Sequence, residues 1–332
     1  MTSIRLLALA AITASAMSAG VANAAGHDPK IDKTDWPASF TVGTASQGGT
    51  YFAYGTGWAN FVAENLGISG GSEITGGPMQ NRALVHTGEV AFGLTTMGPA
   101  RTSIEGNSPL APGLKMDNVC AMFPMYQTPF SVTALSKSGI TSIKDIPAGS
   151  KIGFGPSGST SDTYFPAMLE TLGVDFERRN GGWSDLGTQL QDGLLDVIAF
   201  AAGIPIPAVS QLEVQTEVNI VEFTADELKI ITDTFPVAEF MIPASTYTTL
   251  TKDARAVSMW NFAIADCTLP ESFVYEATKL TMENNDKMVA VHNAARSSLP
   301  ENFSKNSFVP WHPGAARWFN ENGYTIDASL IK

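Results

Sequence analysis

The sequence has few of the residues that carry catalytic or redox chemistry. Its 332 residues include only two cysteines and four histidines, and the histidines lack the spacing of metal ligands. No Gly-Lys-Ser/Thr triplet closes a phosphate-binding loop, and the run Gly155-Pro156-Ser157-Gly158-Ser159 lacks the final glycine of a Gly-x-Ser-x-Gly elbow. We therefore expect a protein that is not an enzyme, with no catalytic residue, no metal site and no cofactor.

Positive charge is also scarce. There are 20 basic and 32 acidic residues, which give a net charge of -12, and the basic residues form no tract. We therefore expect no nucleic-acid partner. The overall charge does not fix the sign of a ligand, because backbone amides can bind an anion inside an acidic protein.

The two cysteines, Cys120 and Cys267, leave two alternatives open. Each lies in or directly after an apolar, strand-like stretch. An oxidising compartment would allow them to pair if those strands are neighbours. Two buried free thiols are the alternative, because pairing depends on a Cα separation that the sequence does not give.

Residues 1–24 have the pattern of a secretory signal. They include the basic Arg5, continue with a short run rich in Leu and Ala, and end in Ala22-Asn23-Ala24. This pattern predicts a signal peptide that is cleaved after Ala24 and a periplasmic location for residues 25–332. An uncleaved membrane anchor is the alternative. The remaining length is more typical of two domains than of one.

Two similar stretches combine a short strand, a glycine-rich loop and a helix. In the first, residues 40–42 are strand-like, a loop with Gly48-Gly49-Thr50 follows, and apolar residues then recur at spacings of three and four. In the second, residues 151–166 repeat this order with Gly158-Ser159-Thr160. Glycine allows close approach to backbone amides, and a helix start favours an anion. A plain tight connection is the structural alternative.

Each stretch is followed by a similar unit, which indicates two lobes of one design. Residues 81–99 and 188–205 each contain a helix stopped by glycine, a buried strand and a turn near proline. Asn81, at the start of the first of these helices, either caps it or contacts a ligand. A strand, a polar break at Tyr126 and a second strand then fit a chain that crosses between lobes.

The chain resembles the TAXI receptors, the solute-binding proteins of bacterial TRAP transporters. The resemblance runs over nearly the whole chain in family order, and it is carried by residues 42–51, 155–160, 193–196, 202–205, 242–247, 274–279 and 312–315. It implies an α/β fold of the type II periplasmic-binding-protein class, with two α/β lobes joined by crossing strands around a ligand cleft. Residues 25–126 and 240–332 would form lobe 1, and residues 127–239 would form lobe 2.

The resemblance also implies a function and a set of binding residues. A small carboxylate, either a glutamate-like amino acid or a dicarboxylic acid, would be captured by lobe closure and delivered to TRAP membrane subunits by a monomeric receptor. The expected ligand-binding residues are Ser46, Gly49, Thr50, Tyr51, Asn81, Met97, Tyr126, Ser159, Thr160 and Gly203.

Three residues qualify this expectation. Pro78 stands where the family usually has serine, which removes a hydroxyl and an N–H donor from one side of the pocket. Arg82 is the nearest candidate for an arginine clamp, but we expect it to pair on a helix face. Asp162, in the first turn of its helix, is expected to complement the helix dipole.

Two other functions remain open from the sequence. A periplasmic sensor would bind a ligand in the same way but would partner a signalling protein. A secreted hydrolase would use Ser157 or Ser159 as nucleophile, although no partner histidine and carboxylate are apparent.

Overall fold

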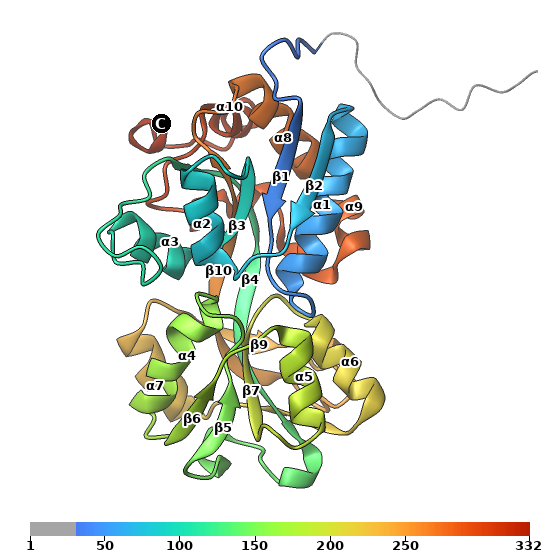
Figure 1. Cartoon of the computed structure of the whole chain (residues 1–332), viewed down its shortest axis with the longest axis vertical. Coiled ribbons are helices and arrows are strands. Elements are labelled where there is room, and N and C mark those ends of the chain that lie inside the picture. Colours follow the sequence, from blue (N-terminus) through green and yellow to red (C-terminus); the bar gives the residue numbers. More distant parts are fainter. Residues whose placement is uncertain (1–30) are drawn as a thin grey trace, which may run out of the picture.

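The computed structural model describes residues 31–332, and the predicted signal peptide, residues 1–24, lies outside them. The chain forms two α/β lobes, one above the other in Figure 1. Two strands, β4 (Val119–Leu135) and β10 (Ala254–Asp266), pass through both lobes. The two-lobe α/β fold predicted from the sequence is therefore confirmed.

Lobe 1 is built from two separate parts of the chain. Its strands are β1 (Ser39–Gly43), β2 (Ser69–Glu73) and β3 (Phe92–Thr96). Its helices are α1 (Thr50–Leu66), α2 (Pro78–His86), α3 (Met97–Ile104), α8 (Glu271–Glu283), α9 (Asn285–Val291) and α10 (Pro313–Glu321). Helices α8 to α10 follow β10 and return the chain to this lobe (Figure 1).

Lobe 2 is one continuous insertion between the crossing strands. Its strands are β5 (Ser150–Gly153), β6 (Phe176–Arg179), β7 (Val197–Ala201), β8 (Val218–Val221) and β9 (Ala238–Ile242). Its helices are α4 (Thr160–Thr171), α5 (Trp183–Gln191), α6 (Pro207–Gln215) and α7 (Ala225–Thr234). The limits expected at residues 126/127 and 239/240 fall inside β4 and β9.

A single sheet runs through both lobes in the order β2-β1-β3-β10-β4-β7-β5-β6. Strands β1 to β3 are parallel in lobe 1, β5 to β7 are parallel in lobe 2, and β10 pairs antiparallel with β3, β4 and β9. Loops at the carboxyl ends of β1, β3, β5 and β7 meet between the lobes. In parallel α/β sheets this is the edge at which ligands bind.

Each lobe has its own apolar core. In lobe 1, Trp58 of α1 lies edge-on to Phe123 of β4 with ring centroids 5.2 Å apart, and helices cover the sheet on both faces. Lobe 2 has one buried cluster around Phe165 and another around Trp183 and Phe200. The central strands β4 and β10 are almost entirely buried and mostly apolar, with a few buried polar residues such as Thr128 and Asn261.

A disulfide joins Cys120 and Cys267, whose Cα atoms are 5.2 Å apart. Strand pairing sets Cys120 opposite Ala265 at the lobe 1 end of β4 and β10. The alternative left open by the sequence is thus decided in favour of pairing. The two cysteines are 147 residues apart in sequence, and the whole of lobe 2 lies between them.

Candidate functional site

A pocket lies where the two lobes meet. It is lined by Ala45, Gly49, Thr50, Tyr51, Gly76, Gly77, Pro78, Thr96, Thr128, Pro156, Ser159, Thr160, Trp183, Ala201 and Ala202. Its free volume of about 30 Å³ is room for about one or two water molecules, and an acid of several carbons needs more space. The lobes are therefore closed onto each other in this structure.

Four helices begin at this pocket, two from each lobe. Thr50 and Pro78 start α1 and α2 in lobe 1, while Thr160 and Trp183 start α4 and α5 in lobe 2. Amides in the first turn of a helix have no acceptor within the helix, and the helix dipole adds a partial positive charge there. Their convergence favours an anion, although no charged side chain lines the pocket.

Both helix starts of lobe 1 are open. The N-cap residues Gly49 and Gly77 supply no side-chain cap, and neither first turn contains an acidic residue. Pro78 is the first residue of α2, a position where the helix itself does not use the N–H group. The donors available at this start are therefore those of Met79 and Gln80.

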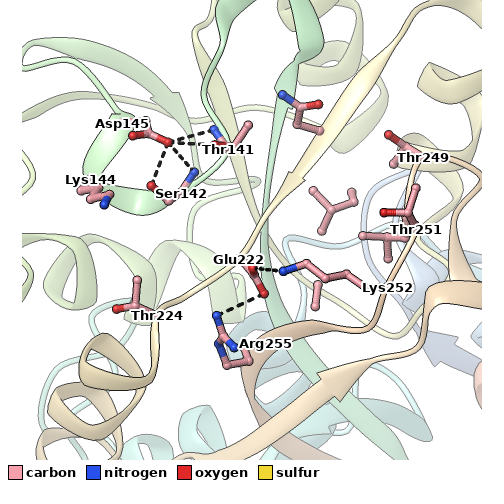
Figure 2. A pocket seen from close by; sticks show the side chains of 14 residues that line it. Thr141, Ser142, Lys144, Asp145, Glu222, Thr224, Thr249, Thr251, Lys252 and Arg255 are labelled. Carbon is pink, nitrogen blue, oxygen red and sulfur yellow. Dashed lines mark hydrogen bonds and ion pairs between the residues drawn. The ribbon is translucent and has the colours of Figure 1, made fainter.

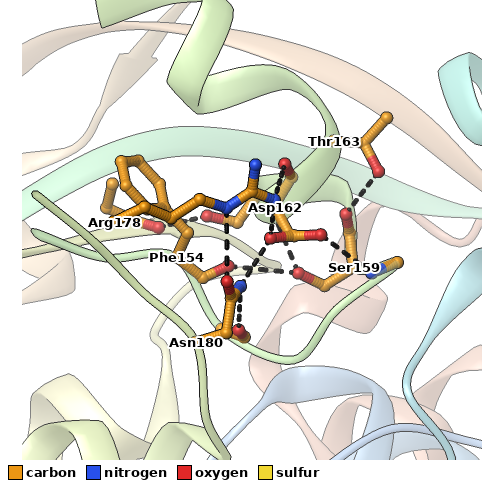
Figure 3. A network of polar contacts seen from close by, with 10 residues as sticks. Phe154, Ser159, Asp162, Thr163, Arg178 and Asn180 are labelled. Atoms are coloured by element: carbon orange, nitrogen blue, oxygen red, sulfur yellow. Dashed lines mark hydrogen bonds and ion pairs between the residues drawn. The ribbon is translucent and has the colours of Figure 1, made fainter.

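The start of α4 in lobe 2 is capped by a neighbouring side chain and holds a carboxylate (Figure 3). The Ser159 hydroxyl accepts a hydrogen bond from the Asp162 amide at 3.2 Å. The Asp162 carboxylate accepts from the Gly158 amide at 2.9 Å and also from the side chains of Arg178 and Asn180. Asp162 thus complements the helix dipole, as predicted, and it is also held by an ion pair.

Hydroxyl groups from both lobes meet at the fully buried amide of Asn261 on β10. Its Oδ1 accepts hydrogen bonds from Tyr51 at 2.6 Å and from Thr96 at 2.8 Å. The Thr96 hydroxyl in turn lies 2.7 Å from the hydroxyl of Thr160. Burial raises the pKa of Tyr51 well above its ordinary value, so the phenol stays protonated.

The loop before α1 also contacts lobe 2 directly. The Trp183 amide donates to Ser46 Oγ at 3.3 Å, and the Ser184 amide donates to the Gln47 carbonyl at 3.3 Å. The Ala208 amide donates to the Gly48 carbonyl at 3.0 Å. At the start of α1, the Thr50 hydroxyl donates to the Gly203 carbonyl. The Trp183 ring stacks on Phe200 with centroids 4.6 Å apart. These contacts hold the lobes in the closed arrangement.

Arg82 does not pair on a helix face, so that prediction is wrong. Its side chain is fully buried, and one nitrogen donates to the Met116 carbonyl at 3.3 Å. Its Nε and Nη1 have no hydrogen-bond partner among residues 31–332. Burial lowers the pKa of Arg82 to about 9. It does not line the pocket, so it supplies no clamp to a ligand there.

The profile of the NMT1-like family matches residues 42–323 of this chain. The chain belongs to the NMT1-like family. Solved structures with the same fold include one described as a periplasmic transporter, with a TM-score of 0.57 and 12% identity over 87% of this chain and 98% of the other. The periplasmic binding protein BugD has a TM-score of 0.57 and 14% identity, and 87% and 99% of the two chains are covered.

A third solved structure is R. palustris Rpa4515 with adipate. Its TM-score is 0.52, its identity is 16%, and 77% of this chain and 84% of that chain are covered. At such low identity these likenesses establish the fold. This NMT1-like chain thus shares its fold with periplasmic binding proteins.

The structure brings five of the predicted binding residues to the pocket wall of this NMT1-like chain: Gly49, Thr50, Tyr51, Ser159 and Thr160. Ser46 lies just outside, where it accepts from lobe 2, and Gly203 contacts Thr50 from the other side.

Three other predicted residues lie behind the wall. Asn81 is fully buried and uses its amide nitrogen to bind the carbonyls of Thr44 and Leu94, so it supports the wall and does not line it. Met97 starts α3 and packs against the lobe 1 core. Tyr126 is buried, and its hydroxyl has no partner among the described residues.

Sequence reasoning missed Thr96, Thr128, Trp183 and Asn261. Thr96 and Thr128 are hydroxyl residues within buried strands, and Asn261 is an amide inside the apolar strand β10. A polar side chain in such a strand requires partners, and this requirement was the available signal. Trp183 follows Gly181-Gly182, but the approach of that loop to Gly49 is a tertiary contact.

A second, larger groove of about 630 Å³ lies in lobe 2, away from the lobe junction (Figure 2). Glu222 binds Lys252 at 2.7 Å there, and its other oxygen lies 3.5 Å from Arg255. Asp145 is bonded to Thr141 and Ser142 of its own turn. Because Glu222 is paired with Lys252 and Arg255 and Asp145 is bonded within its own turn, we assign the groove no ligand.

Two further features bear on function. Within residues 31–332, no group of three or more His, Cys, Asp or Glu side chains is placed to hold a metal ion. No helix in the same range has the length and apolar character needed to span a membrane.

Proposed function

We propose that this chain is a periplasmic receptor that binds a small carboxylate between its lobes and delivers it to the membrane subunits of a TRAP transporter. The two uncapped helix starts of lobe 1, which face a pocket without charged side chains, carry the ligand assignment. The resemblance to TAXI receptors supports the transporter assignment. The signal-like residues 1–24 support export, and we expect a monomer.

Ligand capture would require the lobes to open and close again. The free volume of about 30 Å³ is too small for a glutamate-like amino acid or a dicarboxylic acid. The lobes are linked by two strands and by a few hydrogen bonds from the loop before α1. Breaking those bonds would open the pocket while each lobe keeps its own core. The adipate named with Rpa4515 is an acid of the proposed class.

The experiment is a ligand screen on residues 25–332. Native mass spectrometry would look for a small acid that co-purifies, and protein refolded from denaturant would then be screened by thermal shift. A ligand at 100 times its dissociation constant adds about 2.7 kcal/mol to the free energy of unfolding. We expect C4 to C6 amino or dicarboxylic acids to raise the melting temperature and their neutral diamides to leave it unchanged. No shift with any acid would contradict the carboxylate assignment.

The two alternatives are separable by partner and by chemistry. A sensor would bind the same acids but would be captured by a signalling protein instead of a permease. A hydrolase using Ser159 is disfavoured because this hydroxyl donates to the Phe154 carbonyl and caps α4. No histidine in the described residues hydrogen-bonds to Ser159, and we expect no covalent labelling by a serine-reactive probe.

A further inference from the structure

The orientation of the Asn261 amide is fixed by its surroundings. Its Nδ2 donates to the Tyr126 carbonyl at 2.7 Å and to the Thr128 hydroxyl at 2.6 Å. A backbone carbonyl only accepts hydrogen bonds, so the nitrogen must face Tyr126. The oxygen Oδ1 therefore faces the opposite way, toward Tyr51 and Thr96.

This orientation determines where two hydroxyl protons go. Oδ1 of Asn261 only accepts, and the oxygens of Tyr51 and Thr96 lie 2.6 and 2.8 Å from it. Each hydroxyl has one proton. The two hydroxyl oxygens also lie 3.0 Å from each other, but their contacts with Oδ1 are shorter and Oδ1 cannot donate, so both protons are assigned to Asn261. Tyr51 and Thr96 line the pocket, and they are left with only acceptor lone pairs on that side.

The same network moves as one unit with lobe 1. Tyr51 and Thr96 come from α1 and β3, and Asn261 pairs with Thr96 in the strand register. Opening of the lobes would remove Thr160, the lobe 2 hydroxyl that lies 2.7 Å from the Thr96 hydroxyl, but would leave the other bonds in place. The acceptor character of the two hydroxyls therefore does not depend on closure.

We propose that Asn261 is a positioning residue that makes the hydroxyls of Tyr51 and Thr96 hydrogen-bond acceptors, so that the pocket selects a carboxylate solute that also carries an N–H or O–H donor. This inference rests on the proposed function and narrows it. Hydroxy acids and amino acids fit this description. Unsubstituted dicarboxylates do not, because a second carboxylate beside two acceptors gains no hydrogen bond there.

The charges around the pocket give such a solute a direction. The open starts of α1 and α2, at Gly49 and Gly77, offer amides to its carboxylate. Across the pocket, the start of α4 already holds the carboxylate of Asp162. The carboxylate of the solute therefore lies against lobe 1 helix starts, and its donor group lies at Tyr51 and Thr96, on the side where Thr160 approaches Thr96.

The test uses pairs of acids that differ by one donor group. Succinate against malate, glutarate against 2-hydroxyglutarate and glutarate against glutamate would be titrated calorimetrically into refolded protein. We expect at least one donor-bearing acid to bind about tenfold or more tightly than its unsubstituted partner. Equal or weaker binding of every donor-bearing acid would overturn this inference and leave the proposed function intact. Binding of no acid at all would overturn both.

The variant Asn261→Ala frees both hydroxyl protons to turn toward the pocket. We expect the preference for the donor-bearing acid to fall at least threefold, mainly because the unsubstituted acid gains affinity. An unchanged preference would refute the role of Asn261. Asn306→Ala is the matched control, since Asn306 is a buried lobe 1 amide that bonds its own loop at Val309. It should lose stability without a change in preference.

A second variant keeps the test decisive if Asn261→Ala does not fold. Tyr51→Phe combined with Thr96→Val removes both acceptors and retains the shape of the pocket and Asn261 itself. We expect this double variant to bind donor-bearing and unsubstituted acids with affinities within about threefold of each other. A wild-type preference in this protein would overturn the inference.

Discussion

The start of α1 in lobe 1 and the start of α4 in lobe 2 face the same pocket but satisfy their amides in different ways. Gly49 gives α1 no side-chain cap, and no acid follows in its first turn. Ser159 caps α4, and Asp162 is held there by Arg178 and Asn180 (Figure 3). The start of α1 has no side-chain cap, whereas the start of α4 is capped by its own residues.

The lobes differ in construction as well. Lobe 1 joins two distant parts of the chain and contains the disulfide, whereas lobe 2 is a single insertion between the cysteines. Similar local motifs therefore differ in how their helix starts are capped. Under the proposed function, lobe 1 would receive the charged end of the solute, and lobe 2 would close over it.

The largest effect is expected from removal of the disulfide. Replacing Cys120 and Cys267 by alanine removes a link across 147 residues, and we expect a loss of about 4 kcal/mol in the free energy of unfolding. Because lobe 2 is continuous between the two cysteines, its own unfolding should change little. Calorimetry should show an early transition of lobe 1, and a uniform shift of a single transition would contradict this separation.

Acid should destabilise lobe 1 more than lobe 2, because residues 127–239 contain no histidine. His312 caps α10 in lobe 1, and burial lowers its pKa from 6.5 to about 4. The folded protein protonates His312 less readily than the unfolded chain does. The free energy of unfolding is therefore highest above pH 6.5 and falls as the pH drops toward 4. The difference between the two pKa values corresponds to a loss of about 3 kcal/mol in the free energy of unfolding.

His312→Asn isolates that contribution. Asparagine is a good N-cap and does not titrate, so it can replace the bond from the Gly314 amide. Urea unfolding from pH 7 to pH 4 should show a smaller loss of stability in this variant than in the wild type. Parallel curves for the two proteins would rule out His312 as the titrating group.

The local parts of this comparison were predictable from the sequence. The glycine-rich loops at Gly48-Gly49 and Gly158-Ser159, each followed by apolar spacings of three and four, predicted the strand, loop and helix of both corners. The occurrence of two such corners predicted two lobes of one design. Such features depend on residues close together in the chain, for which turn chemistry and periodicity are sufficient.

The remaining features depend on register between distant segments. Pairing of Cys120 with Cys267 requires β4 and β10 to be neighbours, and the partners of Asn261 come from α1, β3 and β4. Arg82 lies on α2, which packs so that the guanidinium is buried. Sequence patterns near one residue do not contain this tertiary information.

The ion pair between Asp162 and Arg178 at the start of α4 can be removed by Asp162→Asn. This change leaves the guanidinium of Arg178 without its carboxylate and removes the charge that complements α4. Since Asp162 is only 9% exposed, we expect a loss of about 2 kcal/mol, measured by urea unfolding. Asp185→Asn is the control, because Asp185 lies in the first turn of α5 and forms no ion pair among residues 31–332. A similar loss of stability in both variants would show that the ion pair of Asp162 adds nothing beyond the effect of an acid in the first turn of a helix.

The smallest effect is expected at the uncapped start of α1, with Gly49→Ala. A Cβ atom at Gly49 would lie 2.8 Å from the Trp183 ring of lobe 2, so the closed lobes would have to separate slightly. We expect about tenfold weaker binding of the solute, or about 1.4 kcal/mol, with little change in unfolding. Gly182→Ala is the matched control, since its Cβ would approach other atoms only to 3.3 Å. Equal affinities for the two variants would show that closure does not depend on the fit of lobe 1 against Trp183.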